Sequence, residues 1–443
     1  MDFNKKHISS LYLLLGIFVW FPGFAVFNFE NIGIQVVQVL LILLFISFLL
    51  EGSFVIPHFF LFIILIWVFT ILITTFFSTD ISQSLISLIP NFSVLFAMFV
   101  AGGFVTREVK LNRGLFLKGY LWGGGLSAIF SFFQLAFLED NWDLANLLSN
   151  NATYDLPKEQ LSIGELSDSG LLGGAIRPFG FTPEPSVLSS LLIPGIIYLA
   201  ILLIYSPRRT AIHKNPHFYL LIIFVLSLIA STSFAIVTIP VIIFFLGFFV
   251  PNTRIYYKRL FGSFLLFLPF IIYLFWNEET FVSKRLSTLT EDGSFTIRLT
   301  SIITATTIFL QYPLFGYGPG AVKNRFLEIF ELLNLEEKKG PDSLPFSIAS
   351  QMGLLGLAAL GITWGAIIKR FLKNKSCPPE EIAFKGFIIS ILVAFIFQTS
   401  DPMLYHYPIG IGMALIYGYK IKKRVAQPLA LIKSKGFKIK HEY

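Results

Sequence analysis

The chain has 443 residues, enough for two or three soluble domains. Its composition excludes that arrangement, because 55% of the residues are hydrophobic and only 14% are charged, and the mean hydropathy is +0.74. The net charge of +8 does not indicate nucleic-acid binding, since the basic residues are sorted among short loops between apolar runs. These properties predict an integral membrane protein.

Continuous apolar runs recur along the chain, and most have the length that crosses a hydrocarbon core of about 30 Å as a helix. The runs lack the alternation of a membrane β-barrel, so we expect an all-α polytopic protein with one integral membrane domain over residues 1–443. About twelve spans are predicted, at 8–27, 32–50, 55–77, 84–105, 114–138, 186–205, 218–232, 235–250, 260–276, 346–368, 383–399 and 404–420. The seventh and eighth are short, and a broken pair meeting at Ser231-Thr232-Ser233 is the alternative.

Two long polar segments interrupt the apolar chain, at 139–185 and 277–345, and a basic tail follows at 421–443. Under this count of spans, the short loops on the other side carry most of the basic residues, including Arg107, Lys110, Arg113, Arg208, Arg209, Lys214, Arg254, Lys258, Arg259, Lys369, Arg370, Lys373 and Lys375. The positive-inside rule therefore predicts that both termini are cytoplasmic and that both long loops lie outside.

The first long loop ends in a segment stiffened by proline, Arg177-Pro-Phe-Gly180-Phe-Thr-Pro-Glu184-Pro-Ser186. The next helix is expected to start at Pro185 or Ser186, since proline suits the first helical turn. Glu184 would then stand at the helix N-terminus, where the dipole favours a carboxylate, and simple capping is the alternative role. An arginine on the acidic side runs against the charge rule, so Arg177 is a candidate binding residue, with interfacial anchoring as the alternative.

The second long loop contains Arg285 and Arg298. From Arg298 to Gln311 the apolar residues recur at roughly helical spacing, which predicts an amphipathic helix that lies at the membrane interface and has Arg298 at its start. The helix is expected to stop at Tyr312-Pro313. A second amphipathic stretch runs over residues 323–335.

Between these two stretches lies a glycine-rich turn, formed by Gly316, Gly318 and Gly320. Glycines of this kind let the backbone approach a ligand closely. The turn is not a phosphate-binding P-loop, because no Lys-Ser or Lys-Thr pair follows it.

The remaining candidates are single residues. His406 is the only histidine predicted to lie outside, and a structural role is its alternative.

The sequence has neither an Asp-x-Asp motif nor a cluster of His, Asp and Glu with metal-ligand spacing, so we expect no metal and no cofactor. The lone Cys377 excludes an intramolecular disulfide framework.

Three stretches resemble the O-antigen polymerase and ligase superfamily of bacterial envelope glycosyltransferases. The first is Arg177-x-x-Gly180 with the Thr182-Pro-Glu-Pro-Ser186 segment, and the second is Ser231-Thr-Ser-Phe-Ala235 between two short spans. The third is Arg298 about fourteen residues before Tyr312-Pro-Leu-Phe-Gly-Tyr-Gly-Pro-Gly320, followed by Gln351-Met-Gly-Leu-Leu-Gly356. The likeness covers roughly residues 170–370.

The resemblance implies a multi-pass protein of the bacterial inner membrane that transfers glycan from undecaprenyl diphosphate to a sugar acceptor at the periplasmic face. Its implied partners are the lipid-linked oligosaccharide donor and acceptor and the bilayer, together with a chain-length regulator and a flippase. Family ligases carry a histidine shortly before the helix after the large loop. The matching stretch here, Lys339 to Pro345, has Asp342 and no histidine, which favours a polymerase of repeat units over a ligase.

The chemistry assigns roles to the candidate residues. Arg177 and Arg298, with Arg285 in reserve, are expected to bind the diphosphate leaving group through paired hydrogen bonds. Glu184 is the first candidate for the base that takes the proton of the acceptor hydroxyl, and Asp342 and His406 follow. A ligase remains the nearest alternative. A lipid-oligosaccharide flippase or transporter is the alternative from another class, although the predicted spans hold almost no charge at mid-depth.

Overall fold

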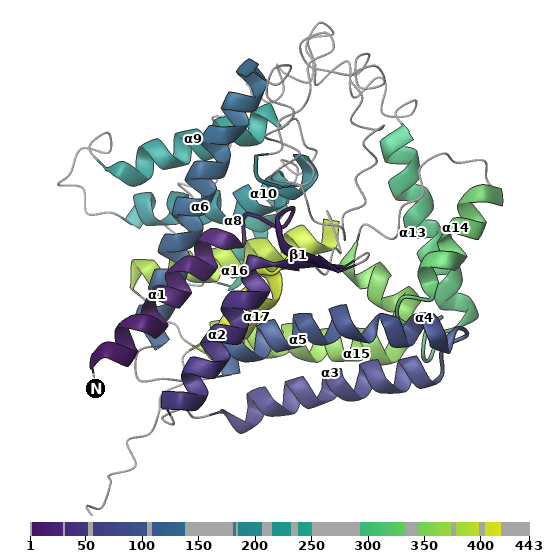
Figure 1. Cartoon of the computed structure of the whole chain (residues 1–443). Helices are drawn as coiled ribbons and strands as arrows, with labels where there is room; N and C mark the ends of the chain where they lie inside the picture. Colours follow the sequence, from purple (N-terminus) through teal and green to yellow (C-terminus); the bar gives the residue numbers. More distant parts are fainter. Residues whose placement is uncertain are drawn as a thin grey trace, which may run out of the picture.

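A computed structural model describes residues 2–29, 32–51, 56–103, 109–137, 180–182, 185–205, 215–231, 238–249, 293–332, 343–373, 378–397 and 404–417. This part of the chain is mostly helical (Figure 1). Its helices are α1 (Asp2–Phe18), α2 (Val36–Glu51), α3 (His58–Phe76), α4 (Ile81–Ile86), α5 (Leu88–Gly103), α6 (Val109–Phe137), α8 (Pro185–Tyr205), α9 (Pro216–Ala230), α10 (Thr238–Phe249), α13 (Gly293–Gln311), α14 (Val322–Leu332), α15 (Leu344–Lys373), α16 (Pro379–Phe397) and α17 (His406–Leu415).

Four stretches of the described helices are long and apolar enough to cross a membrane: His58–Phe76, Ile81–Gly102, Val187–Tyr205 and Leu344–Lys373. Shorter apolar helices in the described residues are His7–Phe18, Val36–Leu50, Pro216–Ala230 and Leu299–Gln311. The class of helical membrane protein is therefore supported, whereas the predicted count of twelve spans is not confirmed. The predicted span 260–276, most of both long loops and the basic tail lie outside the described residues.

The prediction that residues 8–27 and 32–50 are wholly helical is wrong at the ends that face each other. Strands β1 (Ala25–Phe29) and β2 (Ile32–Gln35) form an antiparallel hairpin there, with Phe27 opposite Ile34. The helix before the hairpin ends ahead of Pro22-Gly23, a pair that disfavours continued helix, and aromatic and β-branched residues follow. Helix α2 follows the hairpin, and its beginning lies beside the beginning of α17, since Gln38 is hydrogen-bonded to Tyr405.

A single large hydrophobic core joins most of the helices. Helix α6 packs along α1, α8 packs along α16, and α5 packs along α17 (Figure 1). Helices α1 and α6 can approach closely because glycines lie at their contact. A Cβ atom at Gly16 would collide with the carbonyl oxygen of Phe116, and one at Gly119 would collide with that of Leu13. Trp20 fixes the same pair, since its Nε1 donates to the Tyr120 carbonyl oxygen at 2.8 Å.

Contacts between helix termini define two ends of this structure. The end where α3, α6, α9 and α16 finish, and where α8, α15 and α17 begin, is called the loop end. Ser189 at the start of α8 and Ser231 at the end of α9 lie 2.9 Å apart there, and the Ser343 hydroxyl donates to the Ile396 carbonyl oxygen of α16 at 2.7 Å. The opposite end, where α6 and α16 begin and where α15 and α17 finish, is called the basic end.

Helices α13 and α14 pack beside the beginning of α15, at the right of Figure 1. Their own small core contains Ala305, Ile308, Val322 and Phe326. The side of α13 that packs against the protein is small or polar in part, with Ser301 and Thr304 buried, whereas Leu299, Ile303 and Leu310 are exposed. The apolar stripe predicted for this helix therefore lies largely on its exposed face.

Candidate functional site

The glycine-rich turn between α13 and α14 is wedged against a kink in α15. Gly316, Gly318 and Gly320 have φ values of +72°, +119° and +79°, a region that side-chain-bearing residues rarely adopt. The kink lies at Gly353, whose φ of +62° interrupts α15. The four glycines thus shape both sides of one contact.

The kink and the turn exchange backbone hydrogen bonds. In an unbroken helix the Leu354 amide would donate to the Ser350 carbonyl oxygen. Instead the Tyr317 amide donates to Ser350 at 2.8 Å, and the Leu354 amide donates to the Pro313 carbonyl oxygen at 2.8 Å. The next pair follows the same pattern, because Gly318 donates to Gln351 at 3.1 Å and Leu355 donates to Leu314 at 3.3 Å. The turn therefore replaces two helical hydrogen bonds that the kink removes from α15.

The connection between α3 and α4, together with the residue that ends α4, holds the other face of the turn. The Tyr317 carbonyl oxygen accepts from the Thr79 amide at 3.2 Å and from the Thr79 hydroxyl at 2.9 Å. The Ser87 hydroxyl donates to the Pro319 carbonyl oxygen at 2.8 Å, and the rings of Phe77 and Phe315 stack with centroids 4.4 Å apart. In the described structure, the close backbone approach predicted for these glycines is made to the protein itself. Their role toward a ligand stays a prediction.

Gly180 is the first described residue of the first-loop motif, and it is bound to α6. Its amide donates to Gln134 Oε1 at 2.8 Å, while Gln134 Nε2 donates back to the Gly180 carbonyl oxygen at 3.2 Å. The neighbouring Phe181 ring stacks between Phe21 and Phe130, at centroid distances of 4.4 and 4.8 Å. The chain is thus fixed at the loop end by Gly180 and Phe181, shortly before α8, which begins at Pro185 as expected.

The predicted arginines and carboxylates are only partly placed. Arg177, Glu184, Arg285 and Asp342 lie outside the described residues. Arg298 belongs to α13 but not to its start, because the helix begins at Gly293, more than one turn earlier. Its side chain is outside the described part, so the proposed arginine pair stays a prediction.

His406 is the only candidate base whose side chain the structure places. It is the first residue of α17 and is fully buried. Its ring packs on Phe395 of α16 at a centroid distance of 5.6 Å. The next residue of α16 is Ile396, which accepts the hydrogen bond from Ser343. The end of the second long loop and His406 therefore meet α16 at neighbouring residues.

The residues that flank His406 are held by partners that the sequence patterns did not single out. Tyr405 accepts a hydrogen bond from Gln38 Nε2 at 2.7 Å, and the Tyr407 hydroxyl lies 3.3 Å from Trp364 Nε1. The backbone amide of Gln35 in turn donates to the side-chain Oε1 of Gln38 at 2.8 Å. The available signal was the presence of two glutamines three positions apart at the head of an apolar run.

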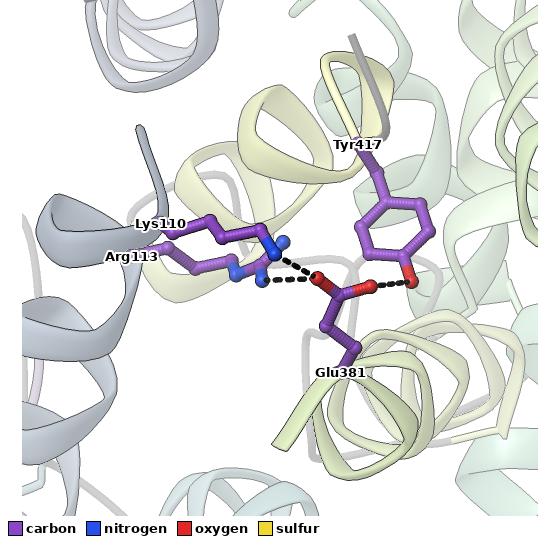
Figure 2. A network of polar contacts seen from close by, with 4 residues as sticks. All are labelled: Lys110, Arg113, Glu381 and Tyr417. Carbon is purple, nitrogen blue, oxygen red and sulfur yellow. Dashed lines mark hydrogen bonds and ion pairs between the residues drawn. The ribbon is translucent and has the colours of Figure 1, made fainter. Parts of the chain in front are cut away.

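The basic end contains a separate polar network, seen close by in Figure 2. Glu381 of α16 accepts from Lys110 of α6 at 2.9 Å and from the Tyr417 hydroxyl at 2.9 Å, with Arg113 4.0 Å away. Burial alone would raise the pKa of Glu381, but the hydrogen bonds from Lys110 and Tyr417 and the nearby cations outweigh it and lower that pKa. The network joins the starts of α6 and α16 to Tyr417, two residues after the end of α17.

Other cations at the basic end are also tied to the helix ends. The Lys385 ammonium is almost fully buried and donates to the Phe371 carbonyl oxygen at 2.9 Å. Arg370 donates to the Tyr417 carbonyl oxygen at 3.3 Å, and Arg113 lies over the Phe384 ring at 4.5 Å. The sequence indicated only that these basic residues lie on the inner side of the membrane. In the structure they also form contacts between helices.

The two ends define a helical membrane protein whose buried polar contacts at the loop end surround the ends of the two long loops. Comparison with protein families adds that residues 217–361 match the family model described as O-Antigen ligase. This match is consistent with the O-antigen polymerase and ligase superfamily. It spans α9, α10, α13, α14 and the kink of α15, and so includes Arg298 and the glycine-rich turn. None of the curated proteins matches the chain.

Proposed function

We propose that the chain is an inner-membrane glycosyltransferase that polymerises undecaprenyl-diphosphate-linked repeat units on the periplasmic face. The family match over residues 217–361 is the observation that carries the proposal, because it contains Arg298, the glycine-rich turn and the kink of α15. The hydrogen bonds that join the glycine-rich turn to the kink of α15 support the proposal, since they attach the end of α13 firmly to α15.

In the proposed reaction an acceptor sugar hydroxyl attacks the anomeric carbon of the donor glycan. The new glycosidic C–O bond forms as the bond from that carbon to the diphosphate oxygen breaks, and the diphosphate leaves with the electron pair. Arg177 and Arg298 bind the developing negative charge, with Arg285 as a further candidate. Glu184, Asp342 or His406 takes the hydroxyl proton, so no metal is required for charge balance.

A ligase that transfers finished glycan to lipid A core is the second candidate, because the matching family model carries that description. The absence of histidine between Lys339 and Pro345 favours the polymerase. The products separate the two, since a polymerase yields a ladder of lengthened lipid-linked intermediates and a ligase does not lengthen the carrier-linked chain.

The test is reconstitution of the purified chain in liposomes with undecaprenyl-diphosphate-linked repeat units, with and without a chelator. Elongation in both samples supports a metal-independent polymerase. Elongation that stops with the chelator would contradict the metal-independent mechanism. Movement of the lipid-linked unit across the bilayer with no change in its length would contradict the proposed enzyme and favour a flippase or transporter.

A further inference from the structure

Three buried polar side chains at the loop end are left without a hydrogen-bond partner among the residues that the structure describes. They are Gln35 at its Nε2 atom, Thr75 at its hydroxyl and His406 at both ring nitrogens. A buried polar group without a partner lowers stability, so such groups are rare unless something else binds them. His406 also lies close to the end of the second long loop, since it packs on Phe395 and Ser343 binds the adjacent Ile396, and this position points to a ligand.

The surroundings hold His406 in place but use neither of its nitrogens. Tyr405 and Tyr407 on either side of it are hydrogen-bonded to Gln38 and Trp364. The ring itself contacts Phe395, which offers an aromatic face and no acceptor. A histidine that served only the packing could be replaced by an apolar ring at no loss.

Gln35 belongs to the same cluster of contacts. It is almost fully buried, and its backbone amide donates to Gln38, whose own amide group reaches Tyr405. Two hydrogen bonds thus connect Gln35 with the residue next to His406, across more than 360 positions of sequence. The side-chain Nε2 of Gln35 remains as an unused donor at this junction.

We propose that His406 and Gln35 form a binding site for a hydroxyl group of the acceptor glycan, which makes His406 the base of the transfer. The inference rests on the proposed function. A hydroxyl is both donor and acceptor, so its hydrogen can bind an imidazole nitrogen while its oxygen accepts from the Gln35 amide. As the oxygen bonds to the anomeric carbon, its proton passes to His406, and the diphosphate departs with the electrons of the broken bond.

The test measures elongation and thermal unfolding for His406→Phe, His406→Gln and Gln35→Leu in the full-length protein. The substrate is the lipid-linked repeat unit isolated from cells that lack this chain. His406→Phe should lower kcat at least ~100-fold, because proton transfer is lost, while the melting temperature stays equal or rises. His406→Gln should keep KM and lose kcat, whereas Gln35→Leu should raise KM by ~10-fold and lower kcat less than the His406 variants do.

His58→Phe is the matched control, because His58 is exposed at the start of α3 and has no place in the site. Its elongation should equal that of the unmodified protein. Unchanged elongation in His406→Phe, or a fall in melting temperature that accounts for its lost activity, overturns the site.

A second measurement keeps the two proposals apart. If the unmodified protein elongates nothing, the polymerase function is lost, but binding can still be followed as the rise in melting temperature caused by the lipid-linked repeat unit. A rise that His406→Phe and Gln35→Leu reduce supports the binding site. A rise of equal size in all variants overturns it and leaves a buried water as the occupant.

Discussion

The side-chain amide of Gln38 donates a 2.7 Å hydrogen bond to the hydroxyl of Tyr405, although 367 positions separate the two residues. This bond joins the beginning of α2 to the beginning of α17. It fixes the backbone next to His406 without using the histidine itself. This contact at the loop end is therefore made by two side chains that lie outside the region matched by the family model.

Replacement of Tyr405 by phenylalanine should lower both stability and activity. The change removes the hydroxyl and leaves the Gln38 amide without its partner, which is expected to cost about 1–3 kcal/mol of unfolding free energy. Thermal unfolding in detergent and the elongation assay measure the two effects. Tyr219→Phe is the control, because Tyr219 is exposed on α9. Equal melting temperatures for both variants would show that the bond does not hold α2 to α17.

Gly318→Ala should destabilise the glycine-rich turn. Its φ of +119° is unfavourable for alanine, and an added Cβ would collide with the Ser78 side chain. Displacement of the turn also exposes the hydrogen bonds that replace those of α15, so we expect a loss of at least ~2 kcal/mol. Gly365→Ala is the control, because no atom lies within 4 Å of a Cβ at that position and alanine favours helix. A Gly318→Ala protein as stable as the control would contradict this account of the turn.

Arg298→Lys should retain the charge but lose most of the elongation activity, by roughly 100-fold. Lysine cannot make the planar two-point contact proposed for the diphosphate. Arg325→Lys provides a comparison within the same family-matched region, since Arg325 is partly exposed and pairs with Glu328 at 2.7 Å. Near-normal polymer length from Arg298→Lys would remove the proposed diphosphate clamp.

Glu184→Gln separates catalysis from helix capping. Glutamine has nearly the same shape but cannot take a proton, so the variant should keep the fold and the bound lipid-linked substrate, and transfer should stop only if Glu184, in place of His406, is the base. The measurements are melting temperature, substrate content and product length. Long chains from this variant would leave Glu184 with a capping role and strengthen His406 as the base.

The Glu381 network predicts a dependence of stability on pH. Because the pKa of Glu381 in the folded protein lies below its usual value of 4.5, the carboxylate contributes stability above that value and loses it as the pH falls through the folded pKa. Glu381→Gln should therefore melt earlier than the unmodified protein at pH 6, with the gap closing toward pH 3. Glu328→Gln should show no such gap, since its ion pair is exposed. A gap that is constant with pH would mean that the carboxylate charge does not stabilise the network.

The sequence located the features that depend on neighbouring residues. It predicted that α8 begins at Pro185 and that the helix after Arg298 stops before Pro313, because proline acts on the backbone within one turn. It also marked Gly316, Gly318 and Gly320 as a turn. The extent of α13 before Arg298 was missed, since Gly293 and Ser294 carry no apolar period.

Only the tertiary structure decided what these features contact. It showed that the glycine-rich turn replaces hydrogen bonds of α15, that Gln35 and Gln38 lie beside the start of α17, and that Glu381 is fixed by Lys110 and Tyr417. Composition determined that this is a helical membrane protein, because apolar runs must satisfy their backbone internally in lipid. Which distant side chains meet depends on how the helices pack, and no local pattern records that.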